Sequence, residues 1–313
     1  MTENDTGKQV PTIQLRPIIF GEVLFDAFPD GSSVLGGAPF NVAWHLQGFG
    51  LKPLFISRVG NDANGDRVRR AMVDWGMDVG ALQRGDQPTG QVRVDLLDGQ
   101  PSFTILPDQA YDFIDAGEAE SALAGIPLAL LYHGSLALRS AVSAAALRVL
   151  AKRSSSVFVD INLRSPWWTR QVVESILQGA RWVKLNDHEL AQLCGQTPSD
   201  RTHAIQLARE VAGRFNPEVL IVTLGVDGAI IVVGDEVVDQ SPPAAVEVVD
   251  TVGAGDAFSA VALMGLMANW PPQVMLSRCL DFAAAVCTIR GATLMDDAFY
   301  RRHQERWGLP VGG

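Results

Sequence analysis

The sequence predicts an α/β fold in which a mostly parallel sheet carries helices on both faces, and three observations support this. Short apolar segments alternate with segments of helical periodicity along most of the 313 residues, which is typical of parallel strands joined by crossover helices. Several of the apolar segments are apolar on both faces, as strands buried on two sides require. The segment 89–107 instead alternates polar and apolar residues about Asp98-Gly99, which indicates a hairpin.

The first elements are expected close to the N-terminus. A strand is predicted over 17–25, and a helix over 38–50 with Pro39 near its start and glycines near its end. A second strand is expected over 52–60 and a second helix over 63–76. The hairpin follows. From its pattern alone it is either a lid or interface, or a surface hairpin without a function of its own.

The alternation becomes clearer after residue 127. The predicted strands cover 127–134, 156–162, 180–186 and 218–225, and the predicted helices cover 141–153, 170–179, 201–215 and 257–270. We see no internal repeat and no low-complexity tract.

Composition limits the function classes. The net charge is −10 without a basic run, so we expect no binding to nucleic acid or to an anionic membrane. Backbone amides and a bound metal could still hold a polyanion. No stretch of about 18 apolar residues predicts a membrane span, and the polar segment 1–16 has no apolar core of a secretory signal.

The three cysteines, Cys194, Cys279 and Cys287, form no close metal-binding pair. We interpret them as buried thiols of a reducing compartment, so we expect a cytoplasmic protein.

Residues 250–258, DTVGAGDAF, carry the most informative motif. It is neither a Walker A loop nor a dinucleotide fingerprint, because Phe258 stands where the third glycine would be. Glycines at a helix start expose N–H groups at the positive end of the helix dipole, so Gly253, Ala254 and Gly255 predict an anion pocket. Asp256 could simply stabilise the helix start. That reading leaves the glycines and the preceding Asp-Thr pair unexplained, whereas an acid beside an anion pocket can activate a hydroxyl that attacks a phosphate.

This motif resembles the C-terminal signature of the ribokinase family of carbohydrate kinases, also called the PfkB family. The resemblance implies that Asp256 is the catalytic base and that the backbone of Gly253, Ala254 and Gly255 forms the anion hole. An aspartate with an ordinary pKa of about 3.9 would suffice, because it mainly orients the hydroxyl. The implied fold is ribokinase-like, with three α/β/α layers, a mostly parallel central sheet and a small β-sheet lid.

A second motif lies near the N-terminus. Gly36 and Gly37 precede a predicted helix with Asn41 in its first turn, which resembles the family's G-G-x-x-x-N sugar site. Glycines let the chain approach a small polyol, and Asn41 and Asp26 supply directional hydrogen bonds. On its own the pattern could be a glycine turn before a helix. The segments GEVLFD and GGAPFN are most similar to those of the fructokinase branch.

Two further motifs resemble the family's nucleotide site. Asn186 and Glu189 match N-x-x-E, in which Asn faces the ATP phosphates and Glu orients magnesium (Mg²⁺), often through water. Glu189 as a helix-capping partner is a compatible alternative, and a zinc helix fails because Gln192 replaces the second His. Thr223, Gly225 and Gly228 resemble the ATP loop, although alone they would indicate an ordinary hairpin.

Two weaker resemblances remain. Arg164 follows a predicted strand end, where ligands of open α/β sheets gather, and in related kinases an Arg near this position holds substrate or phosphate. A surface Arg is the equally weighted alternative. Asp250, with the backbone of 287–291, resembles a potassium (K⁺) site beside the anion hole.

The resemblance implies one kinase domain over 17–308, between tails 1–16 and 309–313. Its lid would consist of about 89–106 with part of 22–36, and through this lid we expect a homodimer. The expected partners are ATP and a sugar. The expected reaction is ATP-dependent phosphorylation of a sugar hydroxyl, with fructose to fructose 6-phosphate as first choice. The alternatives are 2-keto-3-deoxygluconate, ribose, a nucleoside or a phosphosugar, or a catalytically silent sugar-binding regulator.

Overall fold

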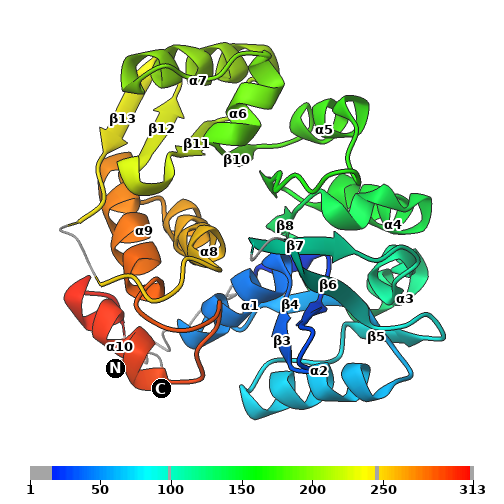
Figure 1. Ribbon diagram of the computed structural model, residues 1–313. Helices are drawn as coiled ribbons and strands as arrows, with labels where there is room; N and C mark the ends of the chain where they lie inside the picture. Colours follow the sequence, from blue (N-terminus) through cyan, green and yellow to red (C-terminus); the bar gives the residue numbers. More distant parts are fainter. Residues whose placement is uncertain (1–15, 98–99, 244–246, 311–313) are drawn as a thin grey trace, which may run out of the picture.

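A nine-stranded sheet forms the centre of the molecule, and a separate four-stranded sheet stands beside it (Figure 1). The computed structural model describes residues 16–97, 100–243 and 247–310. Strand order in the large sheet is β13-β12-β11-β10-β9-β8-β1-β4-β5. The pairs from β5 to β11 are parallel, and β12 and β13 continue the sheet as antiparallel strands. The predicted α/β class with a mostly parallel sheet is confirmed.

The strands of the large sheet have these bounds: β1 Ile18–Phe20, β4 Leu54–Gly60, β5 Leu82–Gly85, β8 Leu131–His133, β9 Val157–Asp160, β10 Trp182–Asn186, β11 Val219–Thr223, β12 Ala229–Val233 and β13 Glu236–Gln240.

Helices cover both faces of this sheet. On one face lie α1 (Ala38–Gly48), α2 (Ala63–Asp74), α8 (Ala254–Met267) and α9 (Pro272–Val286), with α10 (Asp297–Arg306) packed beside them. On the other face lie α3 (Ala116–Ala122), α4 (Ala141–Arg153), α5 (Arg170–Leu177), α6 (Asp187–Cys194) and α7 (Arg201–Phe215). Strand β1 shows why its residues are all apolar: Ile19 packs into the core under α1 and α8, while Ile18 and Phe20 pack into the core under α4.

The prediction of one strand over 17–25 is wrong. The segment forms two strands in different sheets, β1 in the large sheet and β2 (Leu24–Ala27) in the small one. The chain leaves the large sheet at Gly21, which has a φ of 150°. A Cβ at Gly21 would lie 2.5 Å from Cγ of Pro39 at the start of α1, so only glycine fits this crossing.

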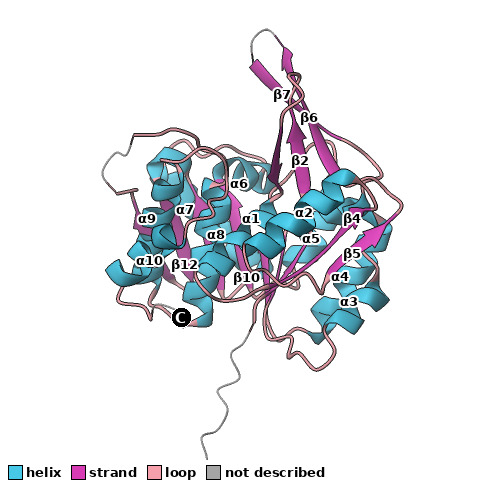
Figure 2. Ribbon diagram, turned by 90° about the horizontal axis from the view of Figure 1, so that it is seen from below, coloured by secondary structure: helices cyan, strands magenta, loops and turns pink. Residues whose placement is uncertain are grey.

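The small sheet has the strand order β3-β2-β6-β7, with β3 at Ser33–Gly36, β6 at Gly90–Leu97 and β7 at Gln100–Ile105. Figure 2 shows β6 and β7 projecting away from the large sheet and its helices. They pair as an antiparallel hairpin, as the alternation at 89–107 predicts. The predicted Asp98-Gly99 turn itself lies outside the described residues.

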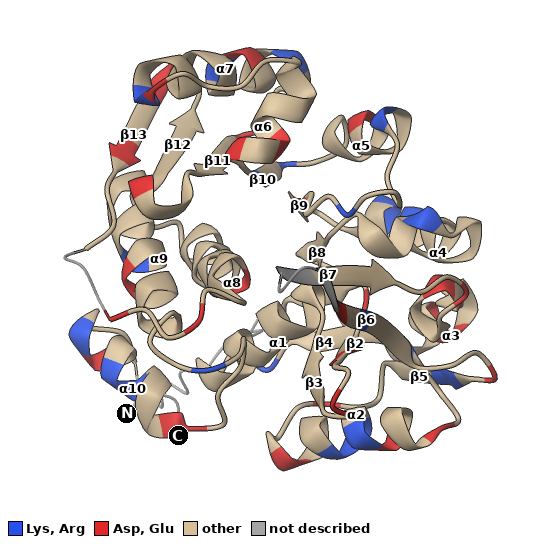
Figure 3. Ribbon diagram, viewed as in Figure 1, with Lys and Arg blue, Asp and Glu red and all other residues tan. Residues whose placement is uncertain are grey.

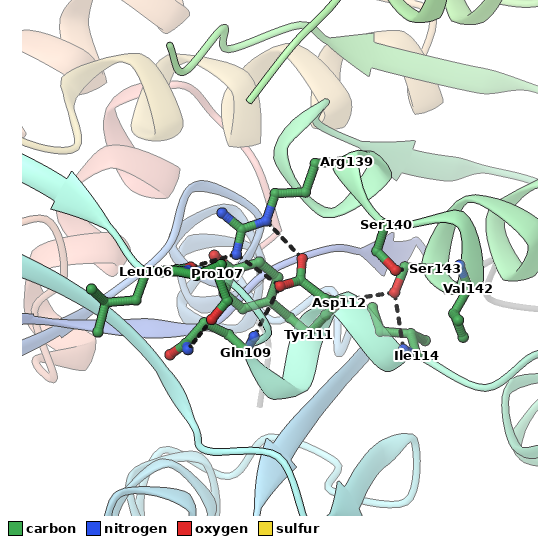
Figure 4. A network of polar contacts seen from close by, with 10 residues as sticks. All are labelled: Leu106, Pro107, Gln109, Tyr111, Asp112, Ile114, Arg139, Ser140, Val142 and Ser143. Atoms are coloured by element: carbon green, nitrogen blue, oxygen red, sulfur yellow. Dashed lines mark hydrogen bonds and ion pairs between the residues drawn. The ribbon is translucent and has the colours of Figure 1, made fainter. Parts of the chain in front are cut away.

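A buried ion pair ties the end of β7 to the body of the protein (Figure 4). The guanidinium of Arg139 donates to both carboxylate oxygens of Asp112, at 2.8 and 2.7 Å, and to the carbonyl of Leu106 at 2.6 Å. It also stacks on Trp167, 4.3 Å from the ring centroid. The two charged side chains are only 6% and 5% exposed, so each depends on the other for compensation.

Charges of both signs are mixed along the exposed helices, as α2, α7 and α10 show in Figure 3. Among the described residues, no helix combines the length and the apolar character that a membrane crossing requires.

We predict that Arg139→Gln destabilises the protein by about 3–5 kcal/mol, because it leaves the Asp112 carboxylate buried without its cation. Arg153→Gln is the matched control. It removes a 3.4 Å contact to Glu120 between two side chains that are 41% and 46% exposed, and it should cost less than about 1 kcal/mol. Urea unfolding measures the free energy of unfolding of each variant. An equal loss of stability in the two variants would contradict the role given to the Arg139–Asp112 pair.

Candidate active site

A cavity of about 700 Å³ opens at the carboxyl ends of β9, β10 and β11 and is covered by the small sheet. Open α/β sheets bind their ligands at this edge. The predicted site residues that line it are Asp26, Gly37, Asn41, Arg164, Asn186, Glu189, Thr223, Gly253, Gly255 and Asp256. The fold thus gathers into one cavity motifs that are separated by more than 200 positions in the sequence.

The other predicted residues lie next to this lining. Gly36 ends β3 beside Gly37, and Ala254 is the first helical residue between two lining glycines. Gly225 and Gly228 bound the short turn that follows Thr223.

Asp250 lies on the loop before α8 rather than on the cavity wall. Its carboxylate accepts bonds from the N–H groups of Gly291 and Val252, both at 3.0 Å. The structure therefore brings Asp250 against the segment 287–291, which is the pairing that the family resemblance implies.

The start of α8 is held by a glycine that no other residue could replace. Gly253 is the N-cap, with a φ of 81°, and a Cβ there would lie 2.4 Å from Cβ of Ala292. Within the described chain, the N–H groups of Gly253, Gly255 and Asp256 donate to no acceptor. These groups are the unpaired donors of a helix start, and they provide an anion site at the cavity wall.

Asp256 faces the cavity from the first turn of α8. Its Oδ2 accepts a 2.7 Å hydrogen bond from Nδ2 of Asn41 on α1. Burial raises the pKa of Asp256 to about 6, against the lowering effect of the Asn41 bond and of the Lys184 and Arg164 charges. Burial outweighs the favourable hydrogen bond and cations, so the pKa of Asp256 lies above the ordinary value of about 3.9 that would suffice for orienting a hydroxyl. A carboxylate with this pKa accepts a proton more readily near neutral pH.

The sugar-site motif forms the neighbouring wall. Gly37 has a φ of 112°, and a Cβ there would lie 2.7 Å from the carbonyl oxygen of Glu22, so glycine is required for this close approach. Asn41 is 4% exposed, and its Oδ1 has no partner among the residues with described placement. Asn41 lines the cavity beside Asp256, and its unpartnered amide oxygen is a buried polar group that the fold itself does not satisfy.

Asn186 and Glu189 form a capping box at the start of α6. Oδ1 of Asn186 accepts from the Glu189 N–H at 2.9 Å, and Glu189 accepts from the N–H groups of Asn186 and Leu163, at 2.8 and 2.7 Å. The capping alternative is thus realised, and it fixes the Glu189 carboxylate in the cavity wall. Burial raises the pKa of this carboxyl. Thr223 lies beside Asn186 in register on the neighbouring strand.

The donor set suits a hard cation that arrives with phosphate. The described part of the chain contains no cluster of three or more His, Cys, Asp or Glu side chains that could hold a metal alone. Magnesium typically takes one or two protein carboxylates and completes its shell with water and phosphate oxygens. Glu189, which lines the cavity, fits that requirement.

Arg164 is exposed at the cavity mouth and donates only to the Leu163 carbonyl, at 3.2 Å, within the part of the chain that is described. Both alternatives of the sequence analysis, a surface Arg and an Arg that holds substrate or phosphate, are compatible with this position.

Sequence reasoning missed a buried ion pair, Lys184 with Asp160, which also lines the cavity. Two charges inside otherwise apolar strands were the signal that could have revealed it. It also missed the apolar lid wall, to which Leu24, Val92, Phe103 and Ile105 contribute.

Comparison with known proteins decides the family. The family model for pfkB family carbohydrate kinases matches residues 19–298. The chain belongs to the PfkB family of carbohydrate kinases. It is therefore an ATP-dependent sugar kinase.

This kinase is 32% identical over 283 residues to the fructokinase of Klebsiella pneumoniae, an alignment that covers 85% of this chain and 89% of the relative. It is 29% identical over 294 residues to the aminoimidazole riboside kinase of Salmonella typhimurium, covering 88% and 89%. The crystal structure of fructokinase from Vibrio cholerae O395 in a fructose, ADP and calcium ion bound form has a TM-score of 0.76 at 25% identity, covering 92% of this chain and 98% of that chain. Relatives with different substrates are thus similarly close.

We predict that kcat/KM for the sugar falls about tenfold per pH unit below a midpoint near pH 6, because only ionised Asp256 can accept a proton. In the wild type, the hydrogen bond from Asn41 lowers the pKa of Asp256. Asn41→Ala removes this bond, so it should move the midpoint upward. A pH series of initial rates measures both midpoints.

The control is Asn61→Ala, at an exposed side chain whose contact to Asp86 is 3.5 Å; its midpoint should equal that of the wild type. Glu22 is a second buried carboxyl, whose pKa burial raises to about 7 without any contribution from Asn41. A midpoint unmoved in Asn41→Ala would assign the titration to a group such as Glu22 and contradict the role of Asp256.

Proposed function

We propose that this kinase transfers the γ-phosphoryl group of MgATP to fructose and forms fructose 6-phosphate. The observation that carries the proposal is the hydrogen-bonded pair of Asn41 and Asp256 beside the free N–H groups of the α8 start, all facing one cavity. This arrangement offers a base, a partner that orients it and an anion site within one cavity, as phosphoryl transfer requires.

The lid wall favours a neutral sugar. Among the lining residues that the lid contributes, Asp26 alone is charged, and the others are apolar. Its carboxylate can accept hydrogen bonds from hydroxyls but repels an anionic group. Arg93, a basic residue of the lid, pairs with Asp95 at 2.9 Å. It follows the lining residue Val92, so its side chain points to the opposite face of the strand.

The chain's residues then have distinct tasks. Asp26 accepts hydrogen bonds from the sugar, and the Asn41 amide supplies a further one. Gly36 and Gly37 allow the close approach of the sugar, and the lid side chains exclude water. Asp256 accepts the proton of the attacking hydroxyl late, because the transition state is loose.

The nucleotide would lie along the ends of β10 and β11. Asn186 and Thr223 face its phosphates, and the turn of Gly225 to Gly228 lies beside the ribose. Glu189 would orient magnesium through water, and magnesium supplies neutralisation of the phosphate charge. A potassium ion at Asp250 and the carbonyls of 287–291 would make the adjoining anion hole more positive.

A second substrate class is favoured by one feature. Arg164 is an unpaired cation at the cavity mouth within the described chain, and it suits the carboxylate of a sugar acid such as 2-keto-3-deoxygluconate.

We also propose a homodimer through the small sheet, where Val34 and Phe103 are 46% and 61% exposed.

We predict that Asp256→Asn lowers kcat by about 10²–10⁴-fold while the Kd for ATP stays within about threefold, because the amide keeps the shape but accepts no proton. Coupled measurement of ADP release gives kcat, and calorimetry gives the Kd. Asp74→Asn at the exposed end of α2 is the matched control and should keep wild-type turnover. A variant at position 256 with most of its activity would remove Asp256 from the chemistry.

Substrate choice is tested by ADP release with a panel of sugars and MgATP. We expect the highest kcat/KM for fructose. A higher value for 2-keto-3-deoxygluconate, lost in Arg164→Gln, would select the second substrate class. A sugar-induced thermal shift without any ADP release would support a catalytically silent regulator and contradict the proposal.

A further inference from the structure

The cavity floor holds a buried ion pair that none of the proposed tasks uses. Nζ of Lys184 lies 2.8 Å from Oδ2 of Asp160, and the two side chains are 7% and 3% exposed. The residues stand opposite each other in register on β10 and β9. Both line the cavity.

The pair lies on the face of the sheet that α8 covers. Trp182 and Phe158, each two positions before a member of the pair, belong to the core under α8, and side chains two apart on a strand share a face. Oδ2 of Asp160 also accepts from the hydroxyl of Ser259 on α8 at 2.7 Å and from Tyr132 on β8 at 3.2 Å. Three neighbouring elements, β10, α8 and β8, therefore fix this carboxylate.

Lys184 keeps its charge in this setting. Burial disfavours the ammonium, but the nearby Asp160 carboxylate outweighs it, so the net effect raises the pKa of Lys184 above its usual value. An ammonium has three N–H donors, and within the described chain only the bond to Asp160 is made. Two donors remain for a ligand in the cavity.

The ammonium lies directly against the start of α8. A Cβ placed on Gly255 would be 3.8 Å from Nζ of Lys184, and the charge of Lys184 acts on Asp256. The cation and the free N–H groups of the helix start therefore converge on one part of the cavity. Negative charge gathers on a phosphoryl group during transfer, and a cation beside unpaired N–H donors suits that charge.

We propose that Lys184 is a catalytic residue of this kinase: its ammonium binds the phosphoryl group in transit, and Asp160 is the positioning residue that holds the ammonium beneath the start of α8. The inference rests on the proposed function. The sugar oxygen forms a bond to the γ-phosphorus, the bond from that phosphorus to the bridging oxygen breaks with its electron pair leaving on ADP, and Asp256 takes the hydroxyl proton. Lys184 keeps its own proton throughout.

A purely structural role is the rival explanation. It is weak, because a buried ion pair rarely stabilises a fold more than apolar side chains of the same size. The rival predicts that replacing both members together leaves catalysis unchanged in the folded protein.

The first test uses the double variant Lys184→Met/Asp160→Asn, which leaves no uncompensated charge in the core. Calorimetry measures the affinity for ADP with sugar and magnesium, in the absence and presence of aluminium fluoride as a mimic of the phosphoryl group in transit. We expect a Kd for ADP within about threefold of wild type, kcat lowered by about 10²–10³-fold, and loss of the tightening by aluminium fluoride. Unchanged kcat and unchanged tightening would overturn the inference.

The second test remains available if the double variant does not fold. Asp160→Asn removes the charge that raises the pKa of Lys184, so kcat should fall at alkaline pH with a midpoint at least one pH unit lower than in the wild type. Lys184→Arg keeps the charge and should retain activity without that alkaline shift. If the wild type and Asp160→Asn lost kcat at the same alkaline midpoint, the inference would be overturned.

Activity of the wild-type protein distinguishes a failure of the role given to Lys184 from a failure of the proposed function. ADP release by wild type together with unchanged catalysis in the Lys184 variants overturns only the role of Lys184. No ADP release by wild type with any sugar overturns the proposed function and this inference together.

Discussion

The hydrogen bond from Asn41 to Asp256 is the interaction on which the rest of the site depends. It joins side chains 215 positions apart, from the first turns of two helices that pack on the same face of the sheet. Each helix start is placed by one glycine, Gly37 against the carbonyl of Glu22 and Gly253 against Ala292. The wall formed by Gly37 and Asn41 and the anion site therefore share one geometry, and neither helix can shift without moving the Asn41–Asp256 pair.

Asp256 shows how the site sets the strength of its base. An acid in the first turn of a helix normally gains from the dipole and becomes a weaker base. Here burial has the larger effect and raises the pKa. The cations at Lys184 and Arg164 limit that rise, so the cavity wall balances desolvation against nearby positive charge. A carboxylate with a pKa of about 6 remains ionised near neutral pH and still accepts a proton well.

Local patterns predicted much of this structure. The helices α4 and α7 begin and end where their periodicity indicates, and the predicted glycines Gly37, Gly253 and Gly255 line the cavity. The split of 17–25 was missed because both strands are apolar, and the break depends on the contact of Gly21 with Pro39. Helix α3 was not predicted, since it is short and rich in small residues. The pairing of Lys184 with Asp160 requires the register between β9 and β10, which no local pattern contains.

The most direct test of the central claim is a crystal structure of the protein with fructose, magnesium and a non-hydrolysable ATP analogue. The account predicts that γ-phosphate oxygens accept hydrogen bonds from the N–H groups at the start of α8. It also predicts that a sugar hydroxyl lies within about 3.2 Å of the Asp256 carboxylate. Phosphates bound away from that helix start, or a sugar with no hydroxyl near Asp256, would contradict it.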